Sequence, residues 1–221
     1  MLNDIEYNEM KRIDDKLYIK LYENPYDDKR NLYKNSVFEL KPGITILVGC
    51  NGYGKSTFLK CLEGTLRSNK IKFIKFNNLI QGGSTSISES MFNNDIASAA
   101  QKMLSSEGEN IFDNIKERAY TMGSYVRGYD NKDLFILFDA IDGLSIDVII
   151  DIKEYLFTPA LKDAEKLNKN LYIFVSANNY EFVNNERCLD VHNNKYLKFN
   201  DYTEYRDYIL KSNKDKSKRF K

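Results

Sequence analysis

The sequence has little cysteine, proline or histidine, and it has no tryptophan. Its 221 residues include three cysteines, three prolines and one histidine. An odd number of cysteines without paired spacing argues against a disulfide framework and against a structural zinc site. No run approaches the roughly 20 apolar residues that a membrane-spanning helix needs, and the polar N-terminus lacks the pattern of a signal peptide. These absences predict a cytoplasmic protein with no membrane insertion.

The charge is nearly balanced along the chain. Thirty-three basic and 32 acidic residues leave a formal net charge of +1, so the protein as a whole has no field that would attract nucleic acid. The exception is the segment 211–221, KSNKDKSKRFK. It is either a solvated, frayed tail or a contact for nucleic-acid phosphates. We therefore predict a single domain over residues 1–210, followed by a basic C-terminal tail over residues 211–221.

Alternating strand and helix patterns predict an α/β fold. The expected strands are 17–22, 36–40, 44–48, 71–76, 134–138 and 171–175, and a terminal hairpin is expected over 189–199. The expected helices are 57–66, 86–104, a pattern from 111 to 122, and 146–157, with a break near Pro159 and a second piece to residue 167. Continuous apolar runs are typical of strands buried on both faces of a parallel sheet. We therefore expect a mostly parallel core sheet with an antiparallel β section before it.

A glycine-rich loop separates the expected strand 44–48 from the expected helix 57–66. Its sequence over residues 49–56, GCNGYGKS, is G-x-x-x-x-G-K-[ST] in the strand–loop–helix context that supports a phosphate-binding loop. The glycines let backbone N–H groups turn toward a phosphate, and the helix start adds its dipole. Lys55 can reach the β- and γ-phosphates, and the Ser56 hydroxyl can bind Mg²⁺. The loop predicts binding of a nucleotide with magnesium.

The inner residues of this loop narrow the class. The loop has the form G-x-N-G-x-G-K-S-T, with Asn51, Gly52, Tyr53, Gly54, Lys55, Ser56 and Thr57. In this form it resembles the ABC-type ATPases, a class that includes transporter cassettes and the RecF/SMC-like heads of DNA repair and chromosome proteins. The resemblance implies a P-loop NTPase fold that binds ATP and Mg²⁺ through these residues.

The resemblance also implies a motif that acts on a partner subunit. ABC-type ATPases work as head-to-head dimers, in which each nucleotide lies between one subunit's phosphate loop and the other's signature, usually L-S-G-G-Q/E. The segment LSSEGE over residues 104–109 matches this signature at Ser106, Gly108 and Glu109. Glu107 replaces the first glycine. Ser106 and Glu109 also form a capping-box pattern, which is compatible with the signature because a capped helix start can bind phosphate. We expect an ATP-dependent homodimer.

Asp139 ends the apolar run 134–138 and resembles the Walker B aspartate, which contacts magnesium directly or through water. In the family the next residue is a glutamate that polarises the attacking water, but here that residue is Ala140. The nearest acid is Asp142, which either assists hydrolysis in that place or is a turn or cap residue. The resemblance therefore implies slow ATP hydrolysis, in which Lys55, Asp139 and Asp142 are the candidate catalytic residues.

Five further positions follow from the resemblance. The switch histidine that the family carries past the last buried strand is replaced by Asn178, whose amide can bind a γ-phosphate but cannot accept a proton. Gln81 is either a loop residue or the glutamine that reaches magnesium and the attacking water. Tyr26 and Tyr33 are candidates for stacking on adenine, and Arg30 is a candidate contact for phosphate.

The number of residues between the phosphate loop and the signature differs among the branches of the ABC-type ATPases. Fewer than 50 residues lie between Thr57 and Leu104, which leaves no room for SMC-type coiled coils and only a reduced helical arm. A transporter cassette has a larger helical subdomain there. The resemblance therefore favours a compact RecF/SMC-like ATPase, similar to those of phages and mobile elements that work on DNA or in phage–host conflict. Two alternatives stay open: the ATP-binding subunit of a transporter, and an ATP-gated interaction module with a DNA or protein partner.

Overall fold

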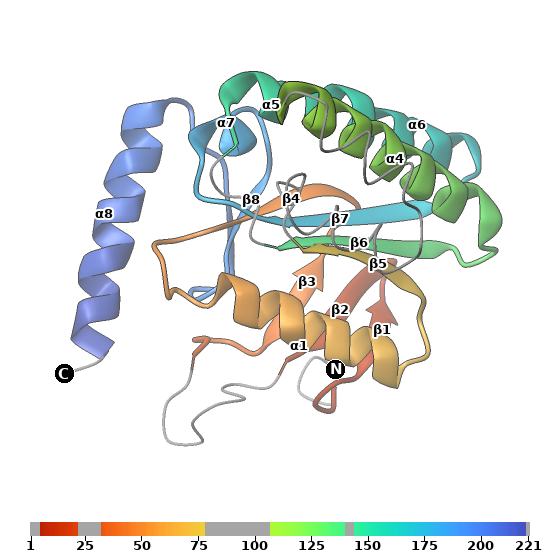
Figure 1. The fold of residues 1–221 in the computed structure, drawn as a ribbon. Helices are drawn as coiled ribbons and strands as arrows, with labels where there is room; N and C mark the ends of the chain where they lie inside the picture. Colours follow the sequence, from red (N-terminus) through yellow and green to blue (C-terminus); the bar gives the residue numbers. More distant parts are fainter. Residues whose placement is uncertain (1–4, 22–31, 78–106, 140–143, 220–221) are drawn as a thin grey trace, which may run out of the picture.

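Strands and helices alternate in this computed structural model, which describes residues 5–21, 32–77, 107–139 and 144–219 (Figure 1). The strands are β1 (Met10–Ile13), β2 (Lys16–Lys20), β3 (Val37–Leu40), β4 (Gly43–Val48), β5 (Phe73–Asn77), β6 (Asp133–Asp139), β7 (Asn170–Ser176), β8 (Cys188–Asp190) and β9 (Lys195–Leu197). The helices are α1 (Lys55–Ser68), α4 (Glu107–Gly128), α5 (Ile146–Asp151), the π-helix η2 (Ile152–Phe157), α6 (Thr158–Lys166), α7 (Tyr180–Val183) and α8 (Tyr202–Arg219). The predicted α/β class is confirmed.

The larger sheet is mostly parallel, as predicted. Its strands stand in the order β5-β6-β7-β4-β8-β9, and among the described strands only β9 runs antiparallel to its neighbour in this sheet. The N-terminal strands β1, β2 and β3 form a separate antiparallel sheet. Because β4, β6 and β7 are parallel neighbours, the residues that follow their carboxyl ends meet at one edge of the sheet.

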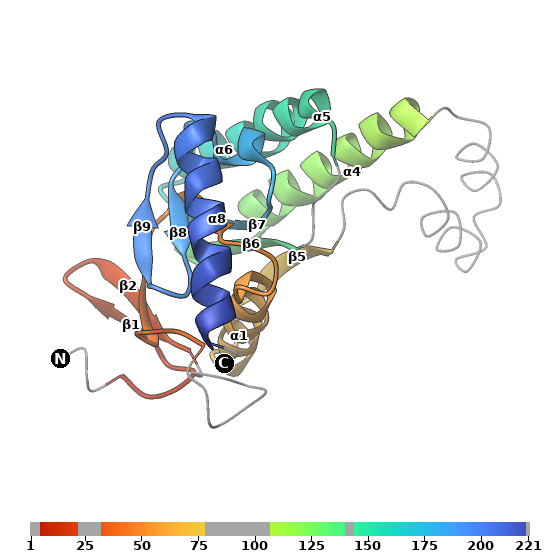
Figure 2. The same ribbon diagram turned by 90° about the vertical axis from the view of Figure 1, so that its left-hand side faces the viewer.

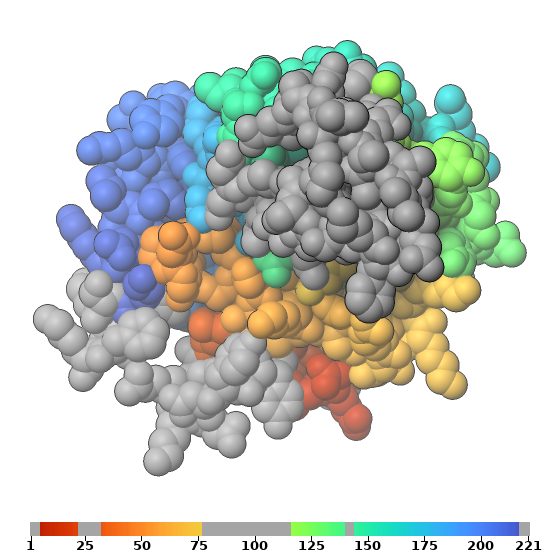
Figure 3. All heavy atoms as spheres, viewed as in Figure 1, coloured from red at the N-terminus to blue at the C-terminus, as the bar shows by residue number. Residues whose placement is uncertain are grey.

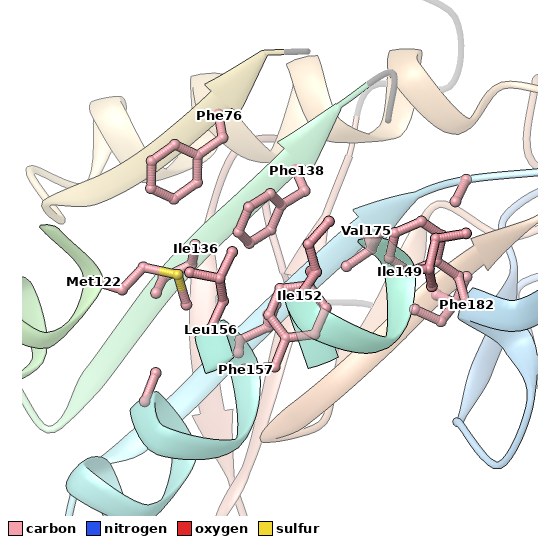
Figure 4. Close-up of a cluster of buried hydrophobic side chains, with 14 of the residues drawn as sticks. Phe76, Met122, Ile136, Phe138, Ile149, Ile152, Leu156, Phe157, Val175 and Phe182 are labelled. Atoms are coloured by element: carbon pink, nitrogen blue, oxygen red, sulfur yellow. The ribbon is translucent and has the colours of Figure 1, made fainter. Parts of the chain in front are cut away.

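Apolar side chains are buried on both faces of this sheet. On one face α1 contributes Phe58, Leu59, Leu62 and Leu66, all buried, at the spacing of a single helix face. On the other face α4, α5, η2 and α6 cover the sheet (Figure 1). Figure 4 shows a cluster of buried hydrophobic side chains from that core. Within it the centroid of the Phe138 ring of β6 lies 4.8 Å from that of Phe76 and 5.1 Å from that of Phe157. The core thus fixes β6 and the carboxylate that ends it.

The predicted helix break near Pro159 is wrong. The segment from Ile146 to Lys166 is helical throughout, because α5, η2 and α6 follow one another without a gap. A proline removes one N–H and crowds the carbonyl four residues earlier. The π-helix accommodates it: the Thr158 N–H donates to the carbonyl of Lys153, five residues earlier, and the Thr158 hydroxyl donates to the same carbonyl at 2.9 Å. A local widening of the helix replaces the expected break.

Helix α8 is the largest described element that the sequence pattern did not predict. Residues 211–219, expected as a tail that was either frayed or bound to nucleic acid, continue a helix that begins at Tyr202. The helix carries few apolar residues, which is why its period was not visible. The predicted helix 86–104 lies outside the described residues. In the described part of the chain, no helix is both long and apolar enough to cross a membrane.

Candidate nucleotide-binding site

The phosphate loop joins β4 to α1 through three glycines with positive φ. The φ angles of Gly49, Gly52 and Gly54 are 136°, 74° and 107°. Residues with a side chain rarely adopt such angles. A Cβ on Gly49 would lie 2.2 Å from Cδ1 of Tyr53, so the ring excludes any larger residue. The Tyr53 N–H donates to the carbonyl of Cys50 at 3.1 Å. The loop thus has the tight curvature by which backbone N–H groups surround a phosphate.

Lys55 is buried within this loop. Its ammonium donates to the carbonyls of Gly49 at 2.7 Å and Cys50 at 3.2 Å, and to Oδ1 of Asn178 at 2.8 Å. The Asn178 amide in turn donates through Nδ2 to Oδ1 of Asn51 at 2.8 Å. The structure therefore brings three sequence-predicted site residues into one hydrogen-bonded chain, although Lys55 and Asn178 are 123 positions apart.

Ser56 and Asp139 form a second pair at the same edge of the sheet. The Ser56 hydroxyl donates to Oδ1 of Asp139 at 2.9 Å, and Asp139 is buried. Hydroxyl and carboxylate oxygens are ligands that Mg²⁺ prefers, usually together with substrate phosphates. Among the residues that the structure describes, no group of three or more His, Cys, Asp or Glu side chains could hold a metal without other ligands. The pair therefore fits a magnesium ion held jointly with a nucleotide.

Tyr53 supports the loop from the side of the terminal hairpin. Its side chain is only 1% exposed, and its ring centroid lies 5.4 Å from that of His192. Nδ2 of Asn193 donates to the Tyr53 hydroxyl at 3.4 Å. Nδ1 of His192 lies 2.7 Å from the carbonyl oxygen of Leu32. The buried ring of Tyr53 is part of this packing, so the backbone is the part of Tyr53 that can meet a nucleotide.

Tyr33 does not stack on adenine, so that prediction is wrong. Its side chain is 2% exposed, and its ring packs edge-on at 5.3 Å from the ring of Phe38 in the core. The neighbouring Leu32 was not predicted, yet its side chain lies 3.3 Å from the place of a Cβ on Gly54. Leu32 belongs to no motif, so the sequence gave no signal that it contacts the loop.

Several predicted site residues lie outside the described part of the chain. These are Tyr26, Arg30, Gln81, Ser106, Ala140 and Asp142. Glu107, Gly108 and Glu109 are the first residues of α4, so this part of the proposed signature stands at a helix start. Thr57 lies in the first turn of α1. The roles of all these residues stay predictions.

The site residues that the sequence did not reveal belong to α8. Its C-terminal half lies beside the phosphate loop, as Figures 1 and 2 show from two directions. Ser212 accepts a hydrogen bond from the Cys50 N–H, and Lys216 donates one to the carbonyl of Asn51. In Figure 3 the blue atoms of α8 adjoin the orange segment that contains the loop. The only signal in the sequence was the spacing of four residues between Ser212 and Lys216, which places both on one face of a helix.

The loop, the buried lysine and the Ser56–Asp139 pair, gathered at the carboxyl edge of a parallel sheet, define a P-loop nucleotide-binding protein. A family model described as an AAA domain matches residues 30–221. The chain therefore belongs to this AAA-domain family of P-loop ATPases, which bind ATP, typically with Mg²⁺. A comparison with curated proteins found no match.

Proposed function

We propose that the protein is a compact RecF/SMC-like ATPase that dimerises on Mg-ATP, hydrolyses it slowly and acts on nucleic acid, in DNA metabolism or phage–host conflict. One observation carries the nucleotide part of this proposal. The Lys55 ammonium, the Asn178 amide and the Ser56–Asp139 pair converge at one edge of the sheet. This edge supplies a cation, an amide and metal ligands within reach of one triphosphate.

The chemistry of these groups supports binding more than fast hydrolysis. Lys55 can exchange its carbonyl acceptors for β- and γ-phosphate oxygens, and the Asn178 amide can donate to the γ-phosphate. A magnesium ion held by Ser56 and Asp139 would neutralise charge on the same oxygens. These interactions stabilise the transition state electrostatically. A proton acceptor for the attacking water is missing at the two family positions, Ala140 and Asn178, and this supports a slow rate.

Dimerisation is testable at the proposed signature. In a two-fold dimer, one substitution enters both composite nucleotide sites. We expect Ser106→Arg to abolish ATP-dependent dimerisation while ATP binding by the monomer stays nearly unchanged, because the arginine stands where the partner's γ-phosphate would lie. Size-exclusion chromatography with light scattering, with and without ATP and Mg²⁺, measures the first effect, and ATP titration measures the second.

The exposed Ser124 of the same helix α4 provides the matched control. Ser124→Arg adds the same charge away from the signature and should leave the dimer intact. A wild-type protein that stays monomeric at saturating ATP would contradict the dimer. Stable dimers that release no phosphate would favour a second candidate, an ATP-gated interaction module, which Ala140 supports because it offers no carboxylate for the water.

A basic groove supports nucleic acid as the partner. The groove, of about 1080 Å³, runs along the edge strand β5 between the end of α1 and the C-terminal half of α4. Its lining includes no acidic residue and four basic ones: Arg67, Lys70, Lys72 and Lys75. Glu63 pairs with Arg67 at 2.8 Å and with Lys75 at 2.9 Å, so the groove keeps a net positive charge. In a chain of net charge +1, this local excess is complementary to a phosphate backbone.

Removing two of these charges tests the partner. We expect the double variant Lys70→Ala, Lys72→Ala to bind a DNA oligonucleotide more weakly, and the slope of log K against log salt to fall by about 0.7–0.9 for each phosphate that a lysine no longer neutralises. Fluorescence anisotropy over a salt series measures both. The control is Lys162→Ala with Lys166→Ala, two exposed lysines of α6. Unchanged affinity and slope in Lys70→Ala, Lys72→Ala would overturn nucleic acid as the partner of this groove.

A further inference from the structure

Three side chains of α8 bind the backbone of the nucleotide site. The Ser212 hydroxyl accepts from the Cys50 N–H at 2.9 Å, and the Lys216 ammonium donates to the carbonyl of Asn51 at 2.7 Å. The Tyr205 hydroxyl donates to the carbonyl of Asn178 at 2.8 Å. One helix therefore holds two consecutive residues of the phosphate loop and the residue at the switch position.

The three residues lie on one stripe of the helix. Positions 205, 212 and 216 are separated by seven and four residues, the spacing of one helical face. Ser212 is 2% exposed, and its hydroxyl also donates to the carbonyl of Ile209 at 2.8 Å. The geometry is that of a docked face rather than of surface side chains that meet the loop by chance.

Aromatic packing fixes the N-terminal half of this stripe. The Tyr205 ring lies 5.4 Å from the ring of Phe199 and 5.7 Å from the ring of Tyr180. One turn later, Tyr208 packs 5.2 Å from Phe199 and donates to the carbonyl of Val48, at the end of β4, at 3.5 Å. Burial and the nearby carboxylate of Asp190 raise the pKa of Tyr208 far above its ordinary value, so this phenol stays a donor. The helix is anchored independently of Lys216.

The contacts of Ser212 and Lys216 act on a part of the loop that is bounded by two glycines. Cys50 and Asn51 lie between Gly49 and Gly52, which both have positive φ. The side chain of Lys216 also lies 3.7 Å from the place of a Cβ on Gly52. A hydrogen bond from an ammonium is stronger than one between neutral groups, so Lys216 limits how far the Asn51–Gly52 peptide can rotate. A loop held in this way is preorganised, which lowers the cost of binding a ligand.

We propose that α8 is a strap that holds the phosphate loop and the switch residue in the arrangement that accepts ATP, with Ser212, Lys216 and Tyr205 as positioning residues. The proposal rests on ATP binding at Lys55 and adds two separate roles to it. Ser212 and Lys216 act on the loop, so they set the affinity for ATP. Tyr205 acts on Asn178, the proposed contact of the γ-phosphate, so it acts mainly on the rate of phosphate release.

Single substitutions in the full chain separate these roles. Lys216→Ala and Ser212→Ala should each weaken ATP binding about fivefold, the effect of one hydrogen bond of ordinary net strength, with little change in the turnover number. Tyr205→Phe removes only the hydroxyl, and it should lower the turnover number about fivefold with a smaller change in the dissociation constant. Titration with a fluorescent ATP analogue and measurement of phosphate release over a range of ATP concentrations give the two quantities.

The controls distinguish positioning from general charge and from loss of fold. Lys214 is an exposed lysine on the same helix, so Lys214→Ala should change neither quantity, whereas Lys216→Arg should restore affinity because it keeps the donor. The melting temperature without nucleotide should fall by no more than about 2–4 °C in Lys216→Ala, the shift expected for one hydrogen bond in a chain of this length. Equal losses for Lys214→Ala and Lys216→Ala, or unchanged affinity in Lys216→Ala and Ser212→Ala, would overturn the strap. If wild type itself does not bind ATP, the proposed function fails first.

Discussion

Lys55→Ala should weaken ATP binding by about 100-fold or more. In the proposed site Lys55 supplies the charge that meets the β- and γ-phosphates, and each hydrogen bond to a charged group contributes about 1.5–3 kcal/mol. The loss of two such bonds therefore exceeds the effect expected for any residue of α8. Isothermal titration with ATP in the presence of Mg²⁺ measures the dissociation constant directly.

The stability of Lys55→Ala without nucleotide has to be compared with that of the wild type. The Lys55 ammonium is hydrogen-bonded to three oxygen atoms before nucleotide binds, so the alanine variant also removes these internal hydrogen bonds. Its melting temperature without nucleotide separates a local effect from unfolding. Lys60 is an exposed lysine of the same helix α1, and Lys60→Ala should bind ATP as wild type does. ATP binding by Lys55→Ala at wild-type strength would show that the nucleotide binds elsewhere.

Ala140→Glu should raise the rate of phosphate release by about 10² or more. A positioned general base or water-orienting carboxylate contributes about 10²–10⁴ in rate, and the substitution restores the family's carboxylate beside Asp139. The expectation rests on the sequence resemblance, since residue 140 lies outside the described part of the chain. Ala140→Gln has nearly the same shape without the charge, so it should not reproduce the gain. Single-turnover phosphate release with saturating Mg-ATP is the measurement.

The same assay assigns the activity that the wild type has. If Asp142 stands in for the missing glutamate, Asp142→Asn lowers the wild-type rate. A fast wild-type rate that Asp142→Asn does not change would point to another group that activates the water. Rates near zero for wild type, Ala140→Glu and Asp142→Asn alike would support the ATP-gated interaction module instead.

The parts of the fold that burial dictates were predictable from the sequence. The apolar runs of β6 and β7 are buried on both faces, and such runs have few other uses in a water-soluble fold. The helix break at Pro159 was mispredicted because a proline in sequence does not show whether the preceding turn can widen. Helix α8 was missed because apolar side chains dock only its N-terminal half, while its C-terminal half docks through Ser212 and Lys216 and leaves no apolar period.

In the candidate site, too, some residues were predictable from the sequence and others were not. Asp139 ends one strand of the parallel core, and Lys55 and Asn178 follow two others, so the topology alone brings them to one edge. Tyr33 follows no such rule, because an aromatic residue near the loop can equally well fill the core, and this one does. Ser212 and Lys216 bind backbone groups of the loop. Every residue type has these groups, so no motif in the sequence indicates which side chain binds them.

The contact between Lys55 and Asn178 also bears on how the site distinguishes triphosphate from diphosphate. In the free protein the Lys55 ammonium donates a hydrogen bond to the amide oxygen of Asn178. In the proposed site a phosphate oxygen would replace this acceptor after binding. If Lys55 meets both the β- and the γ-phosphate, as proposed, ADP would offer the ammonium fewer phosphate oxygens than ATP, and the Asn178 amide would compete more effectively against ADP. In the proposed site, exchange of product for substrate would therefore include a competition between amide and phosphate oxygens for one cation.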